Sequence, residues 1–180
     1  WTRLLSLILG GTVYSFSIIL AVFLVGLGLG SGVGAFLSRT LRSPRGAFFA
    51  CQLLLVAGIA WTAHMMTYSV PYWPVDPRLS ASPWFTFQLD LARVGWAILP
   101  ATLLWGASFP LALAAIADRD KDTGQLVGSV YAANTLGSIV GALLFSVLVG
   151  NLGTQHAQQL LLIGSFLAAL VAFRPTMQWR

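Results

Sequence analysis

The stretch at positions 15–37 constrains the fold of this chain more than any other, because it contains no charged residue. A helix rises about 1.5 Å per residue, so this stretch is long enough to cross a hydrocarbon core of about 30 Å. It is followed at once by Arg39 and Arg42. Helices on the surface of a soluble protein keep a polar face, and this stretch has none. The sequence therefore predicts a membrane-spanning helix.

The composition points to the same environment. Hydrophobic residues make up 57% of the 180 residues and charged residues only 8%, whereas soluble domains have about a quarter of their residues charged. The net charge of +5 could indicate a nucleic-acid partner, but such binding needs a basic patch on a water-exposed surface. Here most basic residues follow apolar stretches, so we expect the lipid bilayer and no nucleic acid as the partner.

Four further spans follow from runs of apolar residues. The run at 123–173 contains no Asp, Glu, Lys or Arg. It is about twice the length of one crossing, and the segment 150–156 supplies a turn within it. The predicted spans are 15–37, 46–68, 94–117, 126–149 and 157–173.

The predicted fold class is all-α, a polytopic transmembrane helical bundle. Residues 1–9 have the character of the tail of a preceding span, so the expected fold is five complete spans plus that tail. We treat 1–180 as a single transmembrane helical domain and expect it to be a fragment of a longer chain.

The distribution of basic residues predicts an orientation. Cytoplasmic loops of membrane proteins carry an excess of Lys and Arg. This rule assigns the 38–45 and 118–122 loops and the C-terminus to the cytoplasm, and the loop at 69–90 to the outer face. The residues on the cytoplasmic side are Arg39, Arg42, Arg45, Arg119, Lys121, Arg174 and Arg180, against Arg78 and Arg93 on the other. The outer loop is rich in Pro and aromatic residues, which suits either the lipid headgroup region or a recognition cleft.

Small residues four positions apart form ladders on two of the predicted spans. Residues at this spacing share a helix face, and small residues there let another helix approach closely inside a bilayer. We expect these faces to contact other transmembrane helices or subunits, while the oligomeric state stays open. The expected helix-packing residues are Gly26, Gly28, Gly30, Gly32, Gly34, Gly128, Ala133, Gly137 and Gly141.

The segment 30–35 also matches the G-x-G-x-x-A pattern of dinucleotide-binding proteins. That pattern needs a preceding strand, a helix that begins at the glycines and an acidic residue about 20 positions later. Here the glycines lie late in a predicted span, and the next acidic residue is Asp76. Helix packing is therefore the better interpretation.

Two polar side chains are expected inside the membrane, Asn134 and His64. An amide within a bilayer must find hydrogen-bond partners, so Asn134 either fixes helix register or lines a substrate cavity. Axial ligation of a heme by His64 is an alternative to a purely structural role. No Cys, His or carboxylate has metal-ligand spacing, so no metal site is predicted.

Two prolines lie inside the third predicted span, Pro100 and Pro110. Proline removes a backbone donor and kinks or breaks a helix. Broken helices surround substrate sites in transporters, and they are also common in other membrane bundles.

The acidic residues are five Asp and no Glu. We expect all five in loops or at membrane boundaries, and moving a polyamine or metal cation through a bilayer normally needs carboxylates inside the bundle. Cation transport by this segment alone is therefore disfavoured, and no catalytic residue is predicted.

A series of ordered motifs resembles the membrane region of bacterial proteins in which a major-facilitator-like helical domain precedes a spermidine-synthase-like domain. The resemblance rests on the segments 1–5 (WTRLL), 23–31 (FLVGLGLGS), 103–110 (LLWGASFP), 127–137 (VGSVYAANTLG) and 141–144 (GALL). The segment 34–42 also resembles the basic loop between helices two and three of major facilitators, although Ser38 replaces the usual Asp.

The resemblance implies a membrane-embedded domain that anchors or feeds a cytoplasmic aminopropyltransferase-like domain outside this sequence. A decarboxylated adenosylmethionine-type donor would belong to that domain, and no cofactor is expected in residues 1–180. The resemblance also implies the bacterial inner membrane, with a cytoplasmic C-terminus. Two alternatives are a non-catalytic subunit of a larger membrane complex and one half of a small-solute transporter.

Overall fold

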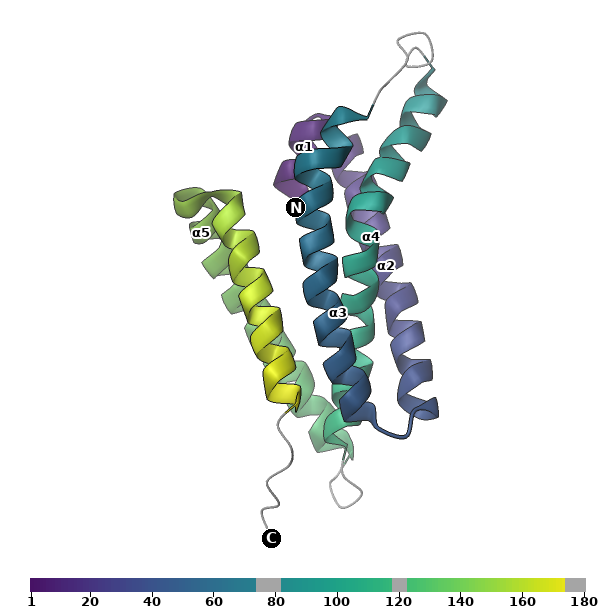
Figure 1. Ribbon diagram of the computed structural model, residues 1–180, viewed down its shortest axis with the longest axis vertical. Coiled ribbons are helices and arrows are strands. Elements are labelled where there is room, and N and C mark those ends of the chain that lie inside the picture. Colours follow the sequence, from purple (N-terminus) through teal and green to yellow (C-terminus); the bar gives the residue numbers. More distant parts are fainter. Residues whose placement is uncertain (74–81, 118–122, 174–180) are drawn as a thin grey trace.

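The computed structural model describes residues 1–73, 82–117 and 123–173, and within these ranges the chain is helical with no strand (Figure 1). The elements in order are α1 (Thr2–Leu9), α2 (Val13–Thr40), α3 (Pro44–His64), a π-helical turn η1 (Met65–Ser69), a 3₁₀ turn η2 (Val70–Tyr72), α4 (Pro83–Ile116) and α5 (Thr123–Phe173).

Local sequence signals set the first boundaries. Gly10 has φ of 93° and separates α1 from α2, a backbone conformation that glycine adopts without a Cβ clash. The Thr12 side chain accepts a hydrogen bond from the Ser15 amide and caps α2. Ser43 caps α3 in the same way through the Gly46 amide, and Pro44 occupies the first turn of α3.

Four helical segments are long and apolar enough to cross a membrane, namely Val13–Thr40, Pro44–Tyr72, Pro83–Ile116 and Gly124–Phe173. The fold is therefore an all-helical one of the membrane-spanning kind. In α5 the helical backbone is interrupted at Gly153, where φ is 81°. Figure 1 shows α5 reversing direction there, so that its two arms lie side by side. The turn is shorter than the predicted 150–156 because this one glycine conformation makes it.

The helices pack in a chain of neighbours. α2 packs mainly on α4, α4 packs on α3, and α3 packs on α5, while α5 barely contacts α4. The largest buried cluster joins α1, α2, η1 and α4, with Leu5, Ile98 and Val94 at its centre. A smaller cluster of Cys51, Ala107 and Leu111 joins α3 and α4 near their other ends. Most side chains of α5 are exposed on the surface of the chain.

The helix that contains the third predicted span begins before that span. α4 starts at Pro83 rather than Val94, so the predicted outer loop is helical from Pro83 onward. Asp90 lies in the helix α4 and not in a loop, and it is only 6% exposed. The other four Asp residues, together with Arg78, Arg119, Lys121, Arg174 and Arg180, lie outside the described residues.

Asp90 is tolerated in the helix because polar partners surround it. The Arg93 guanidinium lies 3.7 Å from its carboxylate, one turn further along α4. The Tyr14 side chain of α2 lies beside Asp90. Arg93 in turn donates to the Trp73 carbonyl at the end of η2. From the sequence pattern, Asp90 and Arg93 mark the end of a predicted span. In the structure the two residues form an ion pair, and the helix continues through them.

Candidate solute site

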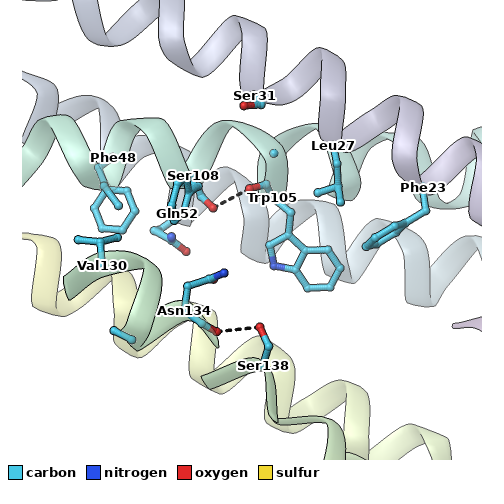
Figure 2. A pocket seen from close by; sticks show the side chains of 14 residues that line it. Phe23, Leu27, Ser31, Phe48, Gln52, Trp105, Ser108, Val130, Asn134 and Ser138 are labelled. Atoms are coloured by element: carbon cyan, nitrogen blue, oxygen red, sulfur yellow. Dashed lines mark hydrogen bonds between the residues drawn. The ribbon is translucent and has the colours of Figure 1, made fainter. Parts of the chain in front are cut away.

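A cavity of about 730 Å³ lies between α2, α3, α4 and the first arm of α5 (Figure 2). Its volume is within the range of small-molecule sites, which is about 300–1,000 Å³. The lining residues are Phe23, Leu27, Ser31, Phe48, Gln52, Trp105, Gly106, Ser108, Phe109, Ala112, Val130, Ala133, Asn134 and Ser138.

Two carboxamide side chains reach this cavity from different helices. Gln52 comes from α3 and is only 8% exposed, and Asn134 comes from α5. Figure 2 shows both amide groups in the same part of the cavity, with the Asn134 amide directed toward Trp105. Among the described residues neither side-chain amide has a hydrogen-bond partner. Gln52 is nearly buried and Asn134 is exposed on α5, and both amides are free to bond to a molecule in the cavity.

The α4 wall adds polar backbone groups. The Ser108 hydroxyl donates to the Trp105 carbonyl over 2.7 Å, which leaves its oxygen lone pairs free to accept. Pro110 has no N–H, so the carbonyl of Gly106, four residues earlier, lacks its usual helical donor. The indole of Trp105 is turned toward the same part of the cavity as Asn134 (Figure 2).

The rest of the lining is apolar and aromatic. Phe23 meets Trp105 edge to face, with ring centroids 6.4 Å apart, and Phe48 and Phe109 contribute further rings. None of the described residues that line the cavity has a carboxylate, amine, imidazole or guanidinium. This arrangement can bind and orient a molecule through hydrogen bonds and ring contacts.

Close packing of α2 against α4 forms the back of the cavity. A Cβ atom added to Gly26 would collide with the Thr102 side chain, and one added to Gly30 would collide with the Leu103 carbonyl. Gly34 is pressed on Ala107 in the same way. From the other side, Gly106 of α4 meets the backbone of Leu27. Three of the predicted glycines therefore face α4 closely, Gly30 and Gly34 against its backbone and Gly26 against the Thr102 side chain.

The other predicted packing positions lie elsewhere. A Cβ atom added to any of five glycines would meet no other described part of the chain within 4 Å, leaving aside neighbouring backbone of the same helix. These are Gly28, Gly32, Gly128, Gly137 and Gly141. Ala133 lines the cavity beside Asn134. The stripe of α2 formed by Gly28 and Gly32, and the glycine ladder of α5, thus have no partner helix among residues 1–73, 82–117 and 123–173.

His64 lies away from this cavity, at the end of α3. It lines a separate hollow of about 460 Å³ with Tyr68 and with Gln155, Gln158 and Gln159 of α5. The rings of His64 and Tyr68 are 5.3 Å apart. Among the described residues no three His, Cys, Asp or Glu side chains gather in a way that could hold a metal ion.

The two prolines do not divide α4, which is one helix from Pro83 to Ile116. A side chain of α3 compensates for the missing donor of Pro100, because the Trp61 indole donates to the Trp96 carbonyl over 3.0 Å. The Thr62 hydroxyl of α3 lies 2.8 Å from the next carbonyl, that of Ala97. The dinucleotide-like segment 30–35 lies inside α2, with helix on both sides.

Sequence reasoning identified Asn134 but missed Gln52 and Trp105. A signal for Gln52 was present, because it is the only Asn or Gln in the apolar run at 46–68. Trp105 carries no comparable signal, since seven Trp residues are spread over the chain.

Comparisons of this chain with protein-family models, with curated proteins and with solved structures gave no match.

Proposed function

We propose that this chain is a membrane-embedded domain that binds a small solute between α2, α3, α4 and α5. The observation that carries the proposal is a cavity lined by two carboxamides, Gln52 and Asn134, that have no hydrogen-bond partner among the described residues. A domain that served only as an anchor would have no need for such groups inside the membrane, where each one is unfavourable without a partner.

We further propose that the domain belongs to a spermidine-synthase-like protein, with a cytoplasmic aminopropyltransferase-like domain that it anchors or feeds. Support comes from the ordered motifs, which include cavity residues such as Trp105 and Asn134. The absence of a carboxylate from the cavity lining argues against a polyamine cation as the occupant. The decarboxylated adenosylmethionine-type donor would be bound by the cytoplasmic domain.

The proposed topology has five crossings, with α5 contributing two, in a bacterial inner membrane. The reversal at Gly153 supports two crossings, because each arm of α5 is about as long as one span. Arg39, Arg42 and Arg45 cluster at the end of the bundle that this topology assigns to the cytoplasm. The C-terminus would lie on the same side.

Two alternatives each have an observation in their favour. A non-catalytic subunit of a larger complex is favoured by the open small-residue ladder of α5, which includes Gly137 and Gly141. One half of a small-solute transporter is favoured by the cavity together with the prolines of α4.

The intact mass of the polypeptide purified from its native membrane separates these proposals. A mass far above 19.3 kDa, with aminopropyl transfer from a decarboxylated adenosylmethionine donor, supports the spermidine-synthase-like assignment. A repeated helical set in the additional chain supports the transporter. A mass close to 19.3 kDa contradicts the attached transferase domain and favours the accessory subunit.

A further inference from the structure

We propose that the cavity selects an uncharged solute with a planar amide-type edge, to which Gln52 and Asn134 form hydrogen bonds. Such an edge bears a hydrogen-bond donor and an acceptor side by side. This inference rests on the solute-binding role proposed above and names the class of solute.

The chemistry of the two side chains supports this class. A carboxamide offers an NH₂ donor and an oxygen acceptor in one plane. Gln52 is more than nine-tenths buried, lines the cavity and has no hydrogen-bond partner among the described residues. Asn134 faces it from α5 (Figure 2). A molecule between them that has both a donor and an acceptor can satisfy both amides, whereas one with only donors or only acceptors leaves part of each amide unpaired.

The electrostatics of the lining exclude the charged relatives of such a molecule. An ion that enters the cavity loses its hydration, and the lining holds no opposite charge to replace it. A neutral molecule avoids this penalty. The rings of Phe23, Phe48 and Trp105 provide surface for an aromatic or apolar part of the solute.

Three isosteric probes test the inference, namely benzamide, benzoate and the benzamidinium cation. They share ring and shape and differ in charge and in the donors and acceptors of the planar group. Binding to the native protein, purified and reconstituted in phosphatidylcholine nanodiscs, is measured by equilibrium dialysis. We expect benzamide to bind at least about tenfold more tightly than either ion.

Two variants and one control locate the effect. Asn134→Leu should weaken benzamide binding at least about fivefold, and Gln52→Glu should shift the preference toward benzamidinium at a pH where the new carboxylate is ionised. Asn151→Leu, the same change as Asn134→Leu at a residue of α5 that bonds the Val147 carbonyl outside the cavity, should bind benzamide as the wild type does. Asn134 is exposed on α5, so its variant should keep the wild-type thermal unfolding temperature.

Each outcome has one meaning. Equal binding of the three probes, or an equal effect of Asn134→Leu and Asn151→Leu, overturns the amide-type selectivity and leaves a solute cavity in place. Failure of every probe to bind the wild type and Gln52→Glu overturns both the selectivity and the solute-binding role.

Discussion

The indole N–H of Trp61 donates to the backbone carbonyl of Trp96, and Trp96 lies four residues before Pro100. In a regular helix that carbonyl would accept from the amide of residue 100, which proline lacks. A side chain of α3 therefore supplies the donor that α4 cannot. This contact explains how α4 continues through a proline within the membrane, and it fixes α3 against α4 next to the core.

We expect Trp61→Phe to lower the free energy of unfolding by about 1 kcal/mol, the typical value of one hydrogen bond in this setting. The same substitution should cost clearly less in a Pro100→Ala background, because the alanine amide can then bond to Trp96 within the helix. Thermal unfolding in detergent of the four proteins of this double-mutant cycle gives the coupling. Trp84→Phe, at an exposed position outside the core, is the control. Additive effects would show that the Trp61 bond does not compensate for the proline.

The two glycine stripes of α2, Gly26–Gly30–Gly34 and Gly28–Gly32, should differ in their tolerance of a methyl group. Gly30→Ala places a Cβ against the Leu103 backbone and should destabilise the protein by about 1–3 kcal/mol. Gly32→Ala enters open space and should be neutral or slightly stabilising, because alanine is the better helix former. The apparent unfolding temperature of each variant in detergent decides this. Equal losses at the two positions would contradict the described packing of α2 on α4.

A substitution at Gly137 distinguishes helix packing within one chain from packing between two chains. A sequence-based argument expects Gly137→Leu to disrupt helix packing, yet no described part of the chain lies near this position. We expect the variant to unfold at the wild-type temperature when the chain is monomeric in detergent. A loss of stability that appears only at protein concentrations where oligomers form, measured by light scattering, would assign the α5 ladder to an interface between subunits.

Replacing Asp90 alone should lower the stability of the protein more than replacing Asp90 and Arg93 together. Removing one member leaves the other charge buried without its partner, which costs about 3–5 kcal/mol in known cases. We expect Asp90→Ala to be strongly destabilising and the Asp90→Ala, Arg93→Met double variant to recover part of the loss. Chemical unfolding in mixed micelles is a suitable measurement. A double variant less stable than either single one would show that the pair does not act as a unit.

The sequence predicted the membrane-spanning class, the approximate position of every long helix and the face of α2 that holds Gly26, Gly30 and Gly34. These features follow from hydropathy and from the helical period, both of which are local properties. Other features depended on distant partners. Asp90 is buried in α4 beside Tyr14 of α2, and no pattern along the chain predicts that contact between two helices.

The cavity could be predicted only in part for the same reason. Asn134 is conspicuous in an apolar run, but its relation to Gln52 depends on how α5 lies against α3. Gly28 and Gly32 show the opposite limitation, since their spacing is suited to packing and yet no described helix contacts them. Spacing predicts which residues share a face, whereas the tertiary arrangement decides whether that face has a partner.

If the cavity takes up solutes, water-soluble reagents must be able to reach position 134. In a Cys51→Ser background, which keeps a hydroxyl donor for the Leu104 carbonyl that the thiol now contacts, cysteine replaces Asn134 or, as a lipid-facing control on the same helix, Val140. Reaction with a charged, membrane-impermeant thiol reagent in nanodiscs is then timed. A solute cavity predicts that Asn134→Cys reacts at least about tenfold faster than Val140→Cys, since thiols react as thiolates, which form in water. Equal, slow reaction at both positions would contradict a solute-accessible cavity between α2, α3, α4 and α5.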